Sequence, residues 1–452
     1  MHEETQLFYT FTSPNINHMA SRRNFLKQGS TALAAMALPA ISNKISLAEI
    51  SAALKSKSNH SAENLAGDED FWAMIREAYT VSPNIINLNN GGVSPQPQHV
   101  QEMQWKYIQM SNEAPSYYMW RILDQGREPL RQKLADLAGC SAEELAINRN
   151  ATEALDTVIF GLPMKAGDEV ILTKQDYPNM INAWKQREKR DGIKLVWLNL
   201  DLPQENDDYF VDQFAGAVTD KTRIVHVTHM INWMGQIQPI RKIADAVKKK
   251  NQNIEVLSDS AHTFAHFDYK IPDLGCDYWG TSLHKWLCAP FGTGLLWVKK
   301  EKIAGLYPLF ANDNPASDDI RKFEAQGTRS FPAEEAIGYA VDFHNAIGSD
   351  RKEGRLRYLK NYWTGKVKDI PKVKIHTSLK DQYSCAICGV SVEGTEPVEL
   401  DTFFFNRYKI HTVAINWENI HCVRVTPNVY TSLKELDKLV AAISDAAKNG
   451  VK

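Results

Sequence analysis

The middle of the chain alternates short β-rich segments with amphipathic helical segments, and this alternation restricts the possible folds more than any other feature. The segments that read as strands are 169–174, 194–200, 223–229, 254–259 and 292–300, and helical periodicity marks the stretches between the first four. A repeated strand–helix–strand unit produces a largely parallel sheet with helices on both faces. We therefore predict an α/β fold whose functional site lies at the carboxyl ends of the strands.

The C-terminal part of the sequence predicts a second, smaller domain. A chain of 452 residues is too long for one small core. From about residue 335 onward, helices and short strands mix without the regular alternation, as in an α+β domain. We predict a large domain at 91–329 and a small domain formed by 71–90 and 330–452. The polar segment 43–70 is predicted to be a linker.

Residues 1–42 read as a leader that precedes the fold. The segment SRRNFLKQGSTALAAMALPAIS contains the pair Arg22 and Arg23, a short apolar run without acidic residues, and small residues near its end. This pattern is typical of a twin-arginine export signal and predicts transport by the twin-arginine translocase to a periplasmic or secreted location. A disordered basic N-terminus is the alternative reading, and the true start is either Met1 or Met19.

Charge, hydropathy and cysteine content argue against several classes of protein. The formal net charge is −2, whereas proteins that bind nucleic acid or a membrane surface need a basic excess. No segment after the leader is long and apolar enough to span a bilayer. The six cysteines are too thinly spread for a disulfide scaffold. Cys385 and Cys388 form a lone CxxC in an apolar segment, which predicts core packing rather than a redox or metal site.

Polar residues follow several of the predicted strands. Asn150 opens a helix, so Ala151 and Thr152 present backbone N–H groups and a hydroxyl at a helix N-terminus, where a phosphate can bind. A plain capped helix is the alternative. An aspartate at the end of an apolar strand is costly unless a cation or donor meets it. The candidates at the other strand ends are Tyr177, Thr228, His229, Asn232, Asp259, His262 and His266.

One lysine, Lys285, lies within the otherwise apolar, small or aromatic segment TSLHKWLCAPFGTGLLWV. Desolvation makes a buried lysine costly, but its lowered pKa makes it a nucleophile toward carbonyls. Ser282 and His284 beside it can donate to a phosphate, and Asp259 can hold a protonated ring nitrogen. A Schiff-base lysine, an aspartate at a pyridinium nitrogen and a phosphate site are what pyridoxal phosphate requires.

A zinc hydrolase is the competing hypothesis from another class. His262 and His266 have the i, i+4 spacing that can bind zinc on a helix. The glutamate that follows the first histidine in an HExxH motif is missing, so no general base is supplied. A binding protein that keeps the cofactor as a prosthetic group is disfavoured because both Lys285 and Arg424 are present.

Four motifs occur in a characteristic order, namely NATEAL, DSAH, SLHK and GTRSFP. With them the chain resembles the class V aminotransferases from INLNNGGVSPQP at 86–97 to RVTPNVYTSLKELD at 424–437. The resemblance implies a fold-type-I pyridoxal-phosphate-dependent transferase fold, with a large domain built on a mainly parallel sheet and a smaller α+β domain. Within the family, the chain is most similar to the isopenicillin-N-epimerase-like subgroup.

The resemblance also implies roles for individual residues around the cofactor ring. Lys285 would form the Schiff base and Asp259 would bind the pyridine nitrogen, both as catalytic residues. His262 and Asn232 would contact the ring hydroxyl. Tyr177 would stack on the ring and share in catalysis, at a position where the family often has a histidine.

The phosphate and the substrate would be held by further residues that match the family. Arg424 would bind the substrate α-carboxylate through its guanidinium, and Asn89 and Asn90 would border the substrate pocket. The resemblance implies a homodimer in which each phosphate site is completed by the other subunit. The phosphate-binding residues would be Ala151, Thr152, Ser282 and His284, joined by Gly327 and Thr328 of the partner subunit.

Several reactions remain open for an amino-acid substrate. Lys285 can take and return the α-proton while the ring held by Asp259 absorbs charge, which suits an aminotransferase or an epimerase. A carbon–sulfur lyase or cysteine desulfurase is the alternative. A desulfurase needs a loop cysteine before the carboxylate-binding arginine, and the matching segment YKIHTVAINWENI has none. Cys422, two residues before Arg424, lies on a predicted strand and is poorly placed.

Overall fold

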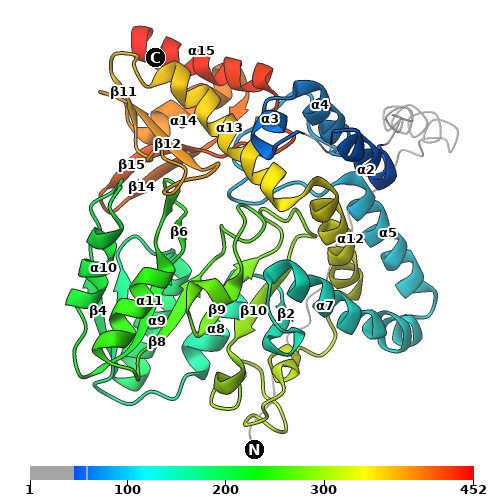
Figure 1. Ribbon diagram of the computed structural model, residues 1–452, viewed down its shortest axis with the longest axis vertical. Helices are drawn as coiled ribbons and strands as arrows, with labels where there is room; N and C mark the ends of the chain where they lie inside the picture. The colour runs from blue at the N-terminus through cyan, green and yellow to red at the C-terminus, as the bar shows by residue number, and fades with distance from the viewer. Residues whose placement is uncertain (1–44, 58–59, 452) are drawn as a thin grey trace, which may run out of the picture. The chain divides into compact units, whose positions relative to one another are not determined.

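The computed structural model describes residues 45–57 and 60–451, and residues 45–452 form one compact unit. A seven-stranded sheet is its largest element, and Figure 1 shows its strands in green and teal. Every neighbouring pair from β9 to β4 is parallel, whereas β10 runs antiparallel to β9 and β2. In spatial order the strands are β2 (Leu145–Asn148), β10 (Gly294–Val298), β9 (Tyr278–Ser282), β8 (Glu255–Asp259), β5 (Thr222–Thr228), β3 (Glu169–Thr173) and β4 (Lys194–Leu198).

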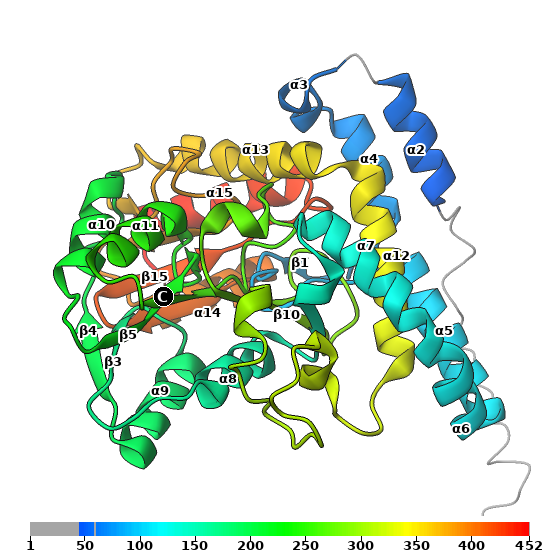
Figure 2. The same cartoon turned by 60° about the horizontal axis from the view of Figure 1, so that its bottom comes forward.

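Helices cover both faces of this sheet, because its strands are apolar on both sides. Leu296 and Val298 of β10 pack in one core with α8 (Ala151–Gly161) and α9 (Pro178–Asp191). Leu295 and Trp297 of the same strand pack in the opposite core with α10 (Asp207–Gly216) and α11 (Ile240–Lys250). Figure 2 shows the two helix layers with the sheet between them. Side chains alternate across a strand, so a central strand fills two cores at once.

The predicted α/β fold is confirmed, with one central strand missed. The five predicted strands coincide with β3, β4, β5, β8 and β10 to within two residues at each end. The missed strand is β9, whose sequence YWGTS has glycine and serine among its five residues and no aliphatic side chain. Tyr278, Trp279 and Thr281 favour a strand, but the segment is short and has no aliphatic run to mark it, and its place is set by pairing with β8 and β10. This strand matters for the site, because β9 ends three residues before Lys285 and so sets where that lysine lies.

A second sheet of four antiparallel strands is formed by the C-terminal part of the chain, drawn in orange and red in Figure 1. Its strands are, in spatial order, β11 (Val373–Ile375), β12 (Cys388–Val392), β15 (Ile420–Val425) and β14 (Val413–Trp417). One face packs in a core with three helices: α13 (Ser349–Val367), α14 (Pro397–Tyr408) and α15 (Leu433–Asn449). Ile415, Ile420 and Cys422 on the other face join a core of the seven-stranded sheet.

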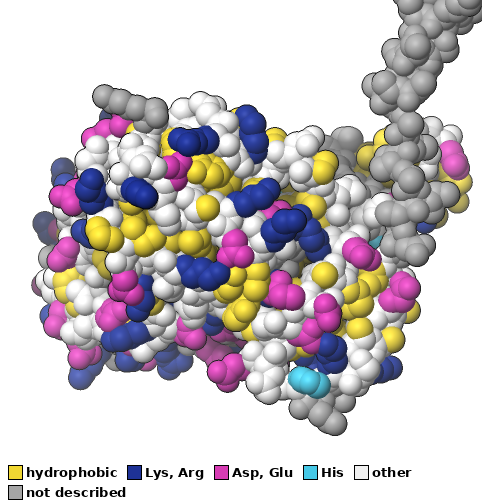
Figure 3. All heavy atoms as spheres, turned by 90° about the horizontal axis from the view of Figure 1, so that it is seen from above, with side chains coloured by type: hydrophobic (Ala, Val, Ile, Leu, Met, Phe, Trp, Pro, Cys, Tyr) yellow, Lys and Arg dark blue, Asp and Glu magenta, His cyan; other side chains and the backbone are white. Residues whose placement is uncertain are grey.

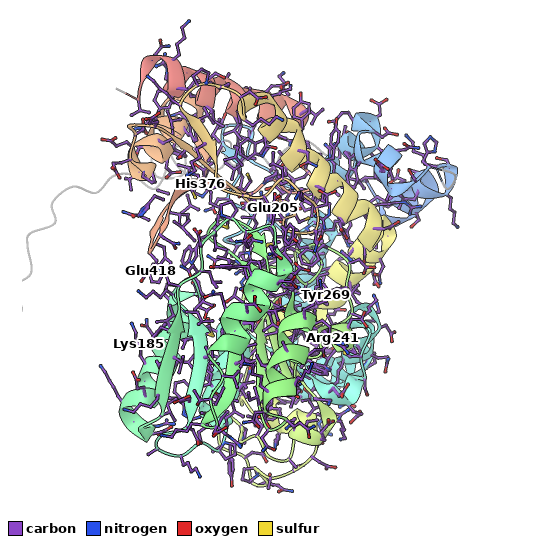
Figure 4. The ribbon with its side chains drawn as sticks, turned by 60° about the vertical axis from the view of Figure 1, so that its left-hand side comes forward. Lys185, Glu205, Arg241, Tyr269, His376 and Glu418 are labelled. Carbon is purple, nitrogen blue, oxygen red and sulfur yellow. The ribbon has the colours of Figure 1, made fainter. Side chains whose placement is uncertain are left out.

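Polar contacts also connect the two sheets. Glu205, labelled in Figure 4, lies where the two sheets meet and accepts a hydrogen bond of 2.6 Å from Ser378 Oγ. On the same carboxylate, Lys380 forms an ion pair at 2.7 Å. Trp417 of β14 donates its indole N–H to the Lys174 carbonyl, which directly follows β3. The carboxyl ends of the large sheet are therefore held against the small sheet.

The predicted linker at 43–70 is wrong for the part that the structure describes. That part forms α2 (Leu47–Ser56) and α3 (Ala62–Ala66), and α4 (Glu69–Glu77) follows. Ile50, Leu54 and Leu65 are buried in a core that also contains Trp286, the neighbour of Lys285. Polar composition concealed these helices, because two apolar residues spaced i, i+4, such as Ile50 and Leu54, are enough to anchor a helix of nearly three turns to a larger body. The predicted leader, 1–42, lies outside the described residues.

The remaining elements surround the two sheets, and none of the described helices is long and apolar enough to cross a membrane. Basic and acidic side chains are interspersed over the face shown in Figure 3. The longer helices are α5 (Gln98–Glu113), α7 (Arg127–Ala138) and α12 (Phe331–Ile347), and α6 spans Pro115–Tyr117. Short strand pairs join β1 (Ile86–Asn87) to β13 (Ile410–His411) and β6 (Met230–Ile231) to β7 (Gln236–Ile237). Single helical turns are Tyr118–Ile122, Leu123–Gly126, Ala142–Glu144, Ile271–Leu274, Lys300–Lys302 and Ile320–Glu324.

Candidate active site

A cavity of about 420 Å³ lies at the carboxyl ends of the large-sheet strands, facing β14 and β15. Strand register explains why the polar residues meet there. Thr228 of β5 pairs with Asp259 of β8, and Asp259 pairs with Gly280 of β9, so β5 and β8 end at one level and β9 extends two residues further, to Ser282. Ten of the predicted site residues line this cavity: Ala151, Thr152, Tyr177, Asn232, Asp259, His262, Ser282, His284, Lys285 and Arg424.

Lys285 reaches into this cavity and contacts His262. Its Nζ lies 2.9 Å from His262 Nε2. Burial lowers the pKa of Lys285 to about 8, the carboxylate of Asp259 opposes that shift, and the guanidinium of Arg424 adds to it. Burial and the neighbouring Lys285 also lower the pKa of His262 well below its usual value, so the imidazole is neutral. A neutral imidazole accepts a hydrogen bond at one nitrogen, which fits Lys285 as the donor.

Two buried side chains beside Lys285 each have one polar atom without a hydrogen-bond partner among the described residues. Asp259 accepts one hydrogen bond, of 3.1 Å, from the Ala261 N–H, and its second oxygen has no partner among the described residues. Burial raises the pKa of Asp259, with His226 and Lys285 opposing the shift. His262 Nδ1 is buried and has no hydrogen-bond partner among those residues. Unpaired buried polar groups are costly, and at a cavity they indicate that a ligand supplies the missing partner.

The N-terminus of α8 forms the phosphate-sized end of the cavity. Asn150 caps the helix by accepting from the Glu153 N–H at 2.8 Å. The Ala151 N–H donates to Ser282 Oγ at 2.9 Å, whereas the Thr152 N–H has no acceptor within the described chain. Gly294 allows this helix to approach β10, because a Cβ there would lie 2.6 Å from the Asn150 backbone. Partial positive charge and free donors at a helix N-terminus favour an anion.

His284 completes this end of the cavity. Its Nδ1 lies 3.0 Å from the Thr293 carbonyl, which fixes the ring and leaves Nε2 free for a ligand. Burial lowers the pKa of His284 to about 4, and Lys285 contributes to the shift. His284 is therefore a neutral hydrogen-bonding group.

Arg424 enters the cavity from β15, held in place by two oxygen atoms. Its Nη1 donates to the Asn232 carbonyl and its Nη2 donates to Asn89 Oδ1, each at 3.0 Å. Burial lowers the pKa of Arg424 to about 10, and its buried Nε has no partner among the described residues. The guanidinium therefore has unused donors for an anionic group. Asn89 does not line the cavity but orients the arginine.

Three further residues of the sequence prediction lie outside the cavity. Asn90 is fully buried, donates to the Thr426 carbonyl and accepts from the Tyr430 hydroxyl. Its amide is used within the protein, and its neighbours Gly91 and Gly92 line the cavity instead. Gly327 and Thr328 precede α12, and Thr328 lines a separate cavity of about 780 Å³ that also contacts Asn150 and Thr152. Within one chain, this pair does not reach the site.

An aromatic stack forms one side of the cavity. Tyr177 lies immediately before α9, and its ring stacks on Trp233 with centroids 6.3 Å apart. Trp233 in turn stacks on Trp417 at 5.3 Å. Sequence reasoning selected Tyr177 but missed Trp233, which follows Asn232 directly, and the β14 residues Val413, Ala414 and Ile415. Trp233 was detectable by its place after a strand, whereas nothing in the sequence marked β14.

The zinc alternative loses its second ligand, His266. The segment around His262 and His266 forms turns rather than a helix. His266 Nδ1 lies 2.7 Å from the His262 carbonyl, and Nε2 accepts from the Ala386 N–H at 3.0 Å. Both ring nitrogens are therefore used within the protein, and the ring lies flat against Trp286 with centroids 3.6 Å apart. No group of three or more metal-ligating side chains converges among the described residues.

The unpaired groups fit a flat, phosphorylated pyridine. The Thr152 N–H and His284 could bind a phosphate, the free carboxylate oxygen of Asp259 could meet a protonated ring nitrogen, and Lys285 has an amine in the same cavity. This donor set matches the needs of pyridoxal phosphate.

Comparison with known proteins gives the same family for most of the chain. The model of the aminotransferase class-V family matches residues 86–439. An isopenicillin N epimerase from Amycolatopsis lactamdurans is 24% identical over 83% of this chain and 99% of its own length. A probable cysteine desulfurase from Synechocystis is 27% identical over 67% of this chain and 76% of its own.

The fold agrees with a solved structure as well. That structure is a C-DES mutant with glycine covalently linked to the PLP cofactor. It superposes with a TM-score of 0.74 at 20% sequence identity, covering 82% of this chain and 99% of the other.

Proposed function

The chain belongs to the class V aminotransferase family, and from this premise we propose that it acts at the α-carbon of an amino acid, as an aminotransferase or an epimerase. Its cofactor is pyridoxal 5'-phosphate, which the family uses. The observation that carries the proposal is the contact of 2.9 Å between Lys285 Nζ and His262 Nε2 in a cavity that also contains Asp259 and Arg424.

The polar residues of the cavity divide between cofactor and substrate. When bound, pyridoxal phosphate acts as an electron sink that makes the bonds to the α-carbon of an amino acid labile. In this proposal Asp259 would bind the pyridine nitrogen, His262 and Asn232 would contact the ring hydroxyl, and Tyr177 would stack on the ring. The phosphate contacts are Ala151, Thr152, Ser282 and His284.

Lys285 is the proposed acid–base residue. With a pKa of about 8, roughly one tenth of its amine is neutral at pH 7, far more than for an ordinary lysine, and this form can accept a proton. His262 accepts a hydrogen bond from Nζ and fixes its direction. Asp259 keeps a negative charge nearby, which stabilises the ammonium once Lys285 has taken the proton.

Arg424 is the proposed binding residue for the substrate α-carboxylate. Its side chain is buried, already oriented by Asn89 and the Asn232 carbonyl, and retains unused N–H donors. A fixed guanidinium binds a carboxylate through two parallel hydrogen bonds and thereby sets the position of the α-carbon relative to Lys285.

A carbon–sulfur lyase is the second candidate, because the similar proteins include a probable cysteine desulfurase. Transfer of sulfur to a protein thiol is disfavoured, since none of the six cysteines, all within the described residues, lines the cavity. Cys422 lies nearest in sequence to Arg424, and burial raises the pKa of its thiol to about 12. A lyase of this kind would release its sulfur product directly.

Two further properties remain proposals that follow from the sequence. A homodimer is expected, because Gly327 and Thr328 do not reach the cavity of their own chain. Export by the twin-arginine pathway to the periplasm or the medium is supported by Arg22, Arg23 and the apolar run after them.

The test is a product analysis of the cofactor-loaded enzyme with a panel of amino acids, together with the visible absorbance of the bound cofactor. An aminotransferase produces a stoichiometric oxo acid in the absence of an amino acceptor. With an epimerase, the optical rotation of the amino-acid solution decays and no oxo acid forms. A lyase releases a thiol or hydrogen sulfide. Absence of cofactor absorbance after incubation with pyridoxal phosphate would overturn the proposal.

A further inference from the structure

The charged side chains of the cavity are few, and the proposed function uses all of them. Among the described residues that line it, the charged groups are Asp259, Lys285 and Arg424. The two lining histidines are neutral, because burial lowers the pKa values of His262 and His284. The described residues of one protomer therefore offer a charged substrate side chain no further opposite charge, and its desolvation there would be unfavourable.

The residues beside Arg424 are apolar instead. Val413 is the cross-strand partner of Arg424, and Ile415 is the partner of Cys422, two residues further along the same face. Cross-strand partners project to the same side of a sheet. An α-carboxylate bound by Arg424 therefore has Val413 and Ile415 next to it, with Ala414 also lining the cavity.

Trp233 extends this apolar surface as a preorganised ring. Its indole N–H donates to the Gln175 carbonyl at 2.8 Å, so the polar atom of the ring already has its partner. Tyr177 and Trp417 stack against it at 6.3 Å and 5.3 Å and hold its orientation. A fixed aromatic ring contributes apolar contact without a loss of side-chain freedom on binding.

We propose that the substrate is an α-amino acid with an uncharged, apolar side chain, which Trp233, Val413 and Ile415 contact while Arg424 binds its carboxylate. This inference rests on the proposed function at the same site. It selects leucine-, methionine- or phenylalanine-like substrates over aspartate, glutamate or lysine.

The first test measures binding without reaction. Carboxylic acids that lack the amino group, 4-methylpentanoate and glutarate, are titrated into the cofactor-loaded enzyme by calorimetry. The inference expects 4-methylpentanoate to bind at least about tenfold more tightly, because burial of a branched side chain is favourable and burial of a second carboxylate is not. Equal binding, or tighter binding of glutarate, overturns the inference.

Two variants that each add a lysine test where the substrate side chain lies. Val413→Lys should reverse the preference toward glutarate by at least tenfold, because it places an ammonium beside the proposed side-chain position. The matched control is Val398→Lys, at a residue that is 62% exposed on α14 and outside this cavity. Trp233→Phe keeps an aromatic ring and should weaken 4-methylpentanoate only slightly, whereas Trp233→Ala should weaken it about tenfold. An unchanged preference in a folded Val413→Lys protein overturns the inference.

The outcomes separate this inference from the proposed function. Changes in cofactor absorbance are recorded with leucine, phenylalanine, glutamate and lysine. If only the charged amino acids change it, the apolar substrate class is wrong and the proposed function stands. If no amino acid changes it in a cofactor-loaded enzyme, the proposed function fails, and the inference fails with it.

Discussion

The two walls of the cavity differ in origin and in chemistry. The strand-end wall consists of Asp259, His262, Ser282, His284 and Lys285, which lie within 27 consecutive residues of the chain. The β14–β15 wall consists of Val413, Ala414, Ile415 and Arg424 and comes from the four-stranded sheet. The first wall is wholly polar, and the second is apolar around one arginine.

We assign the chemical step to the strand-end wall and the selection of the substrate to the β14–β15 wall. The strand-end wall is fixed by strand pairing inside the large sheet, as parallel neighbours place their carboxyl ends at one edge. The β14–β15 wall depends on packing between the two sheets, through contacts such as Trp417 to the Lys174 carbonyl. We expect changes in the first wall to alter kcat and changes in the second to alter KM.

Lys285→Ala should have the largest effect. Removal of a positioned acid–base group lowers the rate by about 10²–10⁴-fold. The same substitution also removes the hydrogen-bond partner of His262. Steady-state kinetics on the best amino acid measures kcat. An effect on KM alone would contradict the division between the walls.

Arg424→Gln should have the next largest effect, on KM. The loss of a buried, hydrogen-bonded cation opposite a carboxylate costs about 2–5 kcal/mol, which corresponds to an increase in KM of about 30- to 5,000-fold. The control is Arg407→Gln, at an arginine on α14 whose side chain is 58% exposed. A fall in kcat with KM unchanged would show that Arg424 belongs functionally to the strand-end wall.

The pH dependence of unfolding tests the environment of Lys285 in the cofactor-free protein. Its folded pKa of about 8 lies below the usual value of 10.5, so the unfolded chain binds more protons between these two pH values. Stability should therefore fall as pH decreases from 10.5 to 8, by about 3 kcal/mol or less.

Lys285→Met should remove this pH dependence. The free energy of unfolding of the variant should exceed that of the wild type by the largest amount below pH 8. The control Lys221→Met changes an exposed lysine and should leave the dependence intact. Denaturant unfolding at several pH values provides the measurement. A flat difference between wild type and Lys285→Met from pH 7 to 10.5 would mean that Lys285 is not desolvated.

Asn89→Ala should have the smallest effect of the four. It removes one of the two hydrogen bonds that orient Arg424, and a hydrogen bond to a charged group contributes about 1.5–3 kcal/mol at most. We expect KM to rise about 5- to 10-fold with kcat nearly unchanged, and Asn84→Ala, at an exposed asparagine nearby, to be neutral. A KM equal to that of the wild type would show that the Asn232 carbonyl suffices to hold the arginine.

Hydrogen bonding decided the roles of two histidines that look equivalent in the sequence. His262 and His266 are both buried, and burial lowers the pKa values of both. His262 contacts Lys285 and keeps one nitrogen unpartnered among the described residues, whereas His266 uses both nitrogens. A spacing of four residues predicted a shared ligand, but only the fold shows that the two rings face different surroundings.

The sequence by itself determined the α/β class, the family resemblance and the strand-end wall. It could do so because hydrophobic periodicity reports strands and helices locally, and parallel pairing then brings consecutive strand ends together. Asp259 and Lys285 follow from that logic even though β9 itself was missed. Polar composition misled the prediction of a linker at 43–70. In the described part of this segment, a few apolar residues such as Ile50 and Leu54 pack its helices against the rest of the protein.

Only the tertiary structure decided what faces the strand ends. Asn89 and Asn90 are adjacent in sequence but have different roles. Asn89 orients Arg424, whereas the side-chain amide of Asn90 is hydrogen-bonded to Thr426 and Tyr430. The apolar β14–β15 wall and the place of Trp233 likewise depend on how one sheet packs on another. Contacts between residues almost 200 positions apart, such as Arg424 with Asn232, leave no periodic trace in either segment. Local sequence therefore encodes the strands and the catalytic groups, whereas the shape that selects a substrate arises only when the two sheets meet.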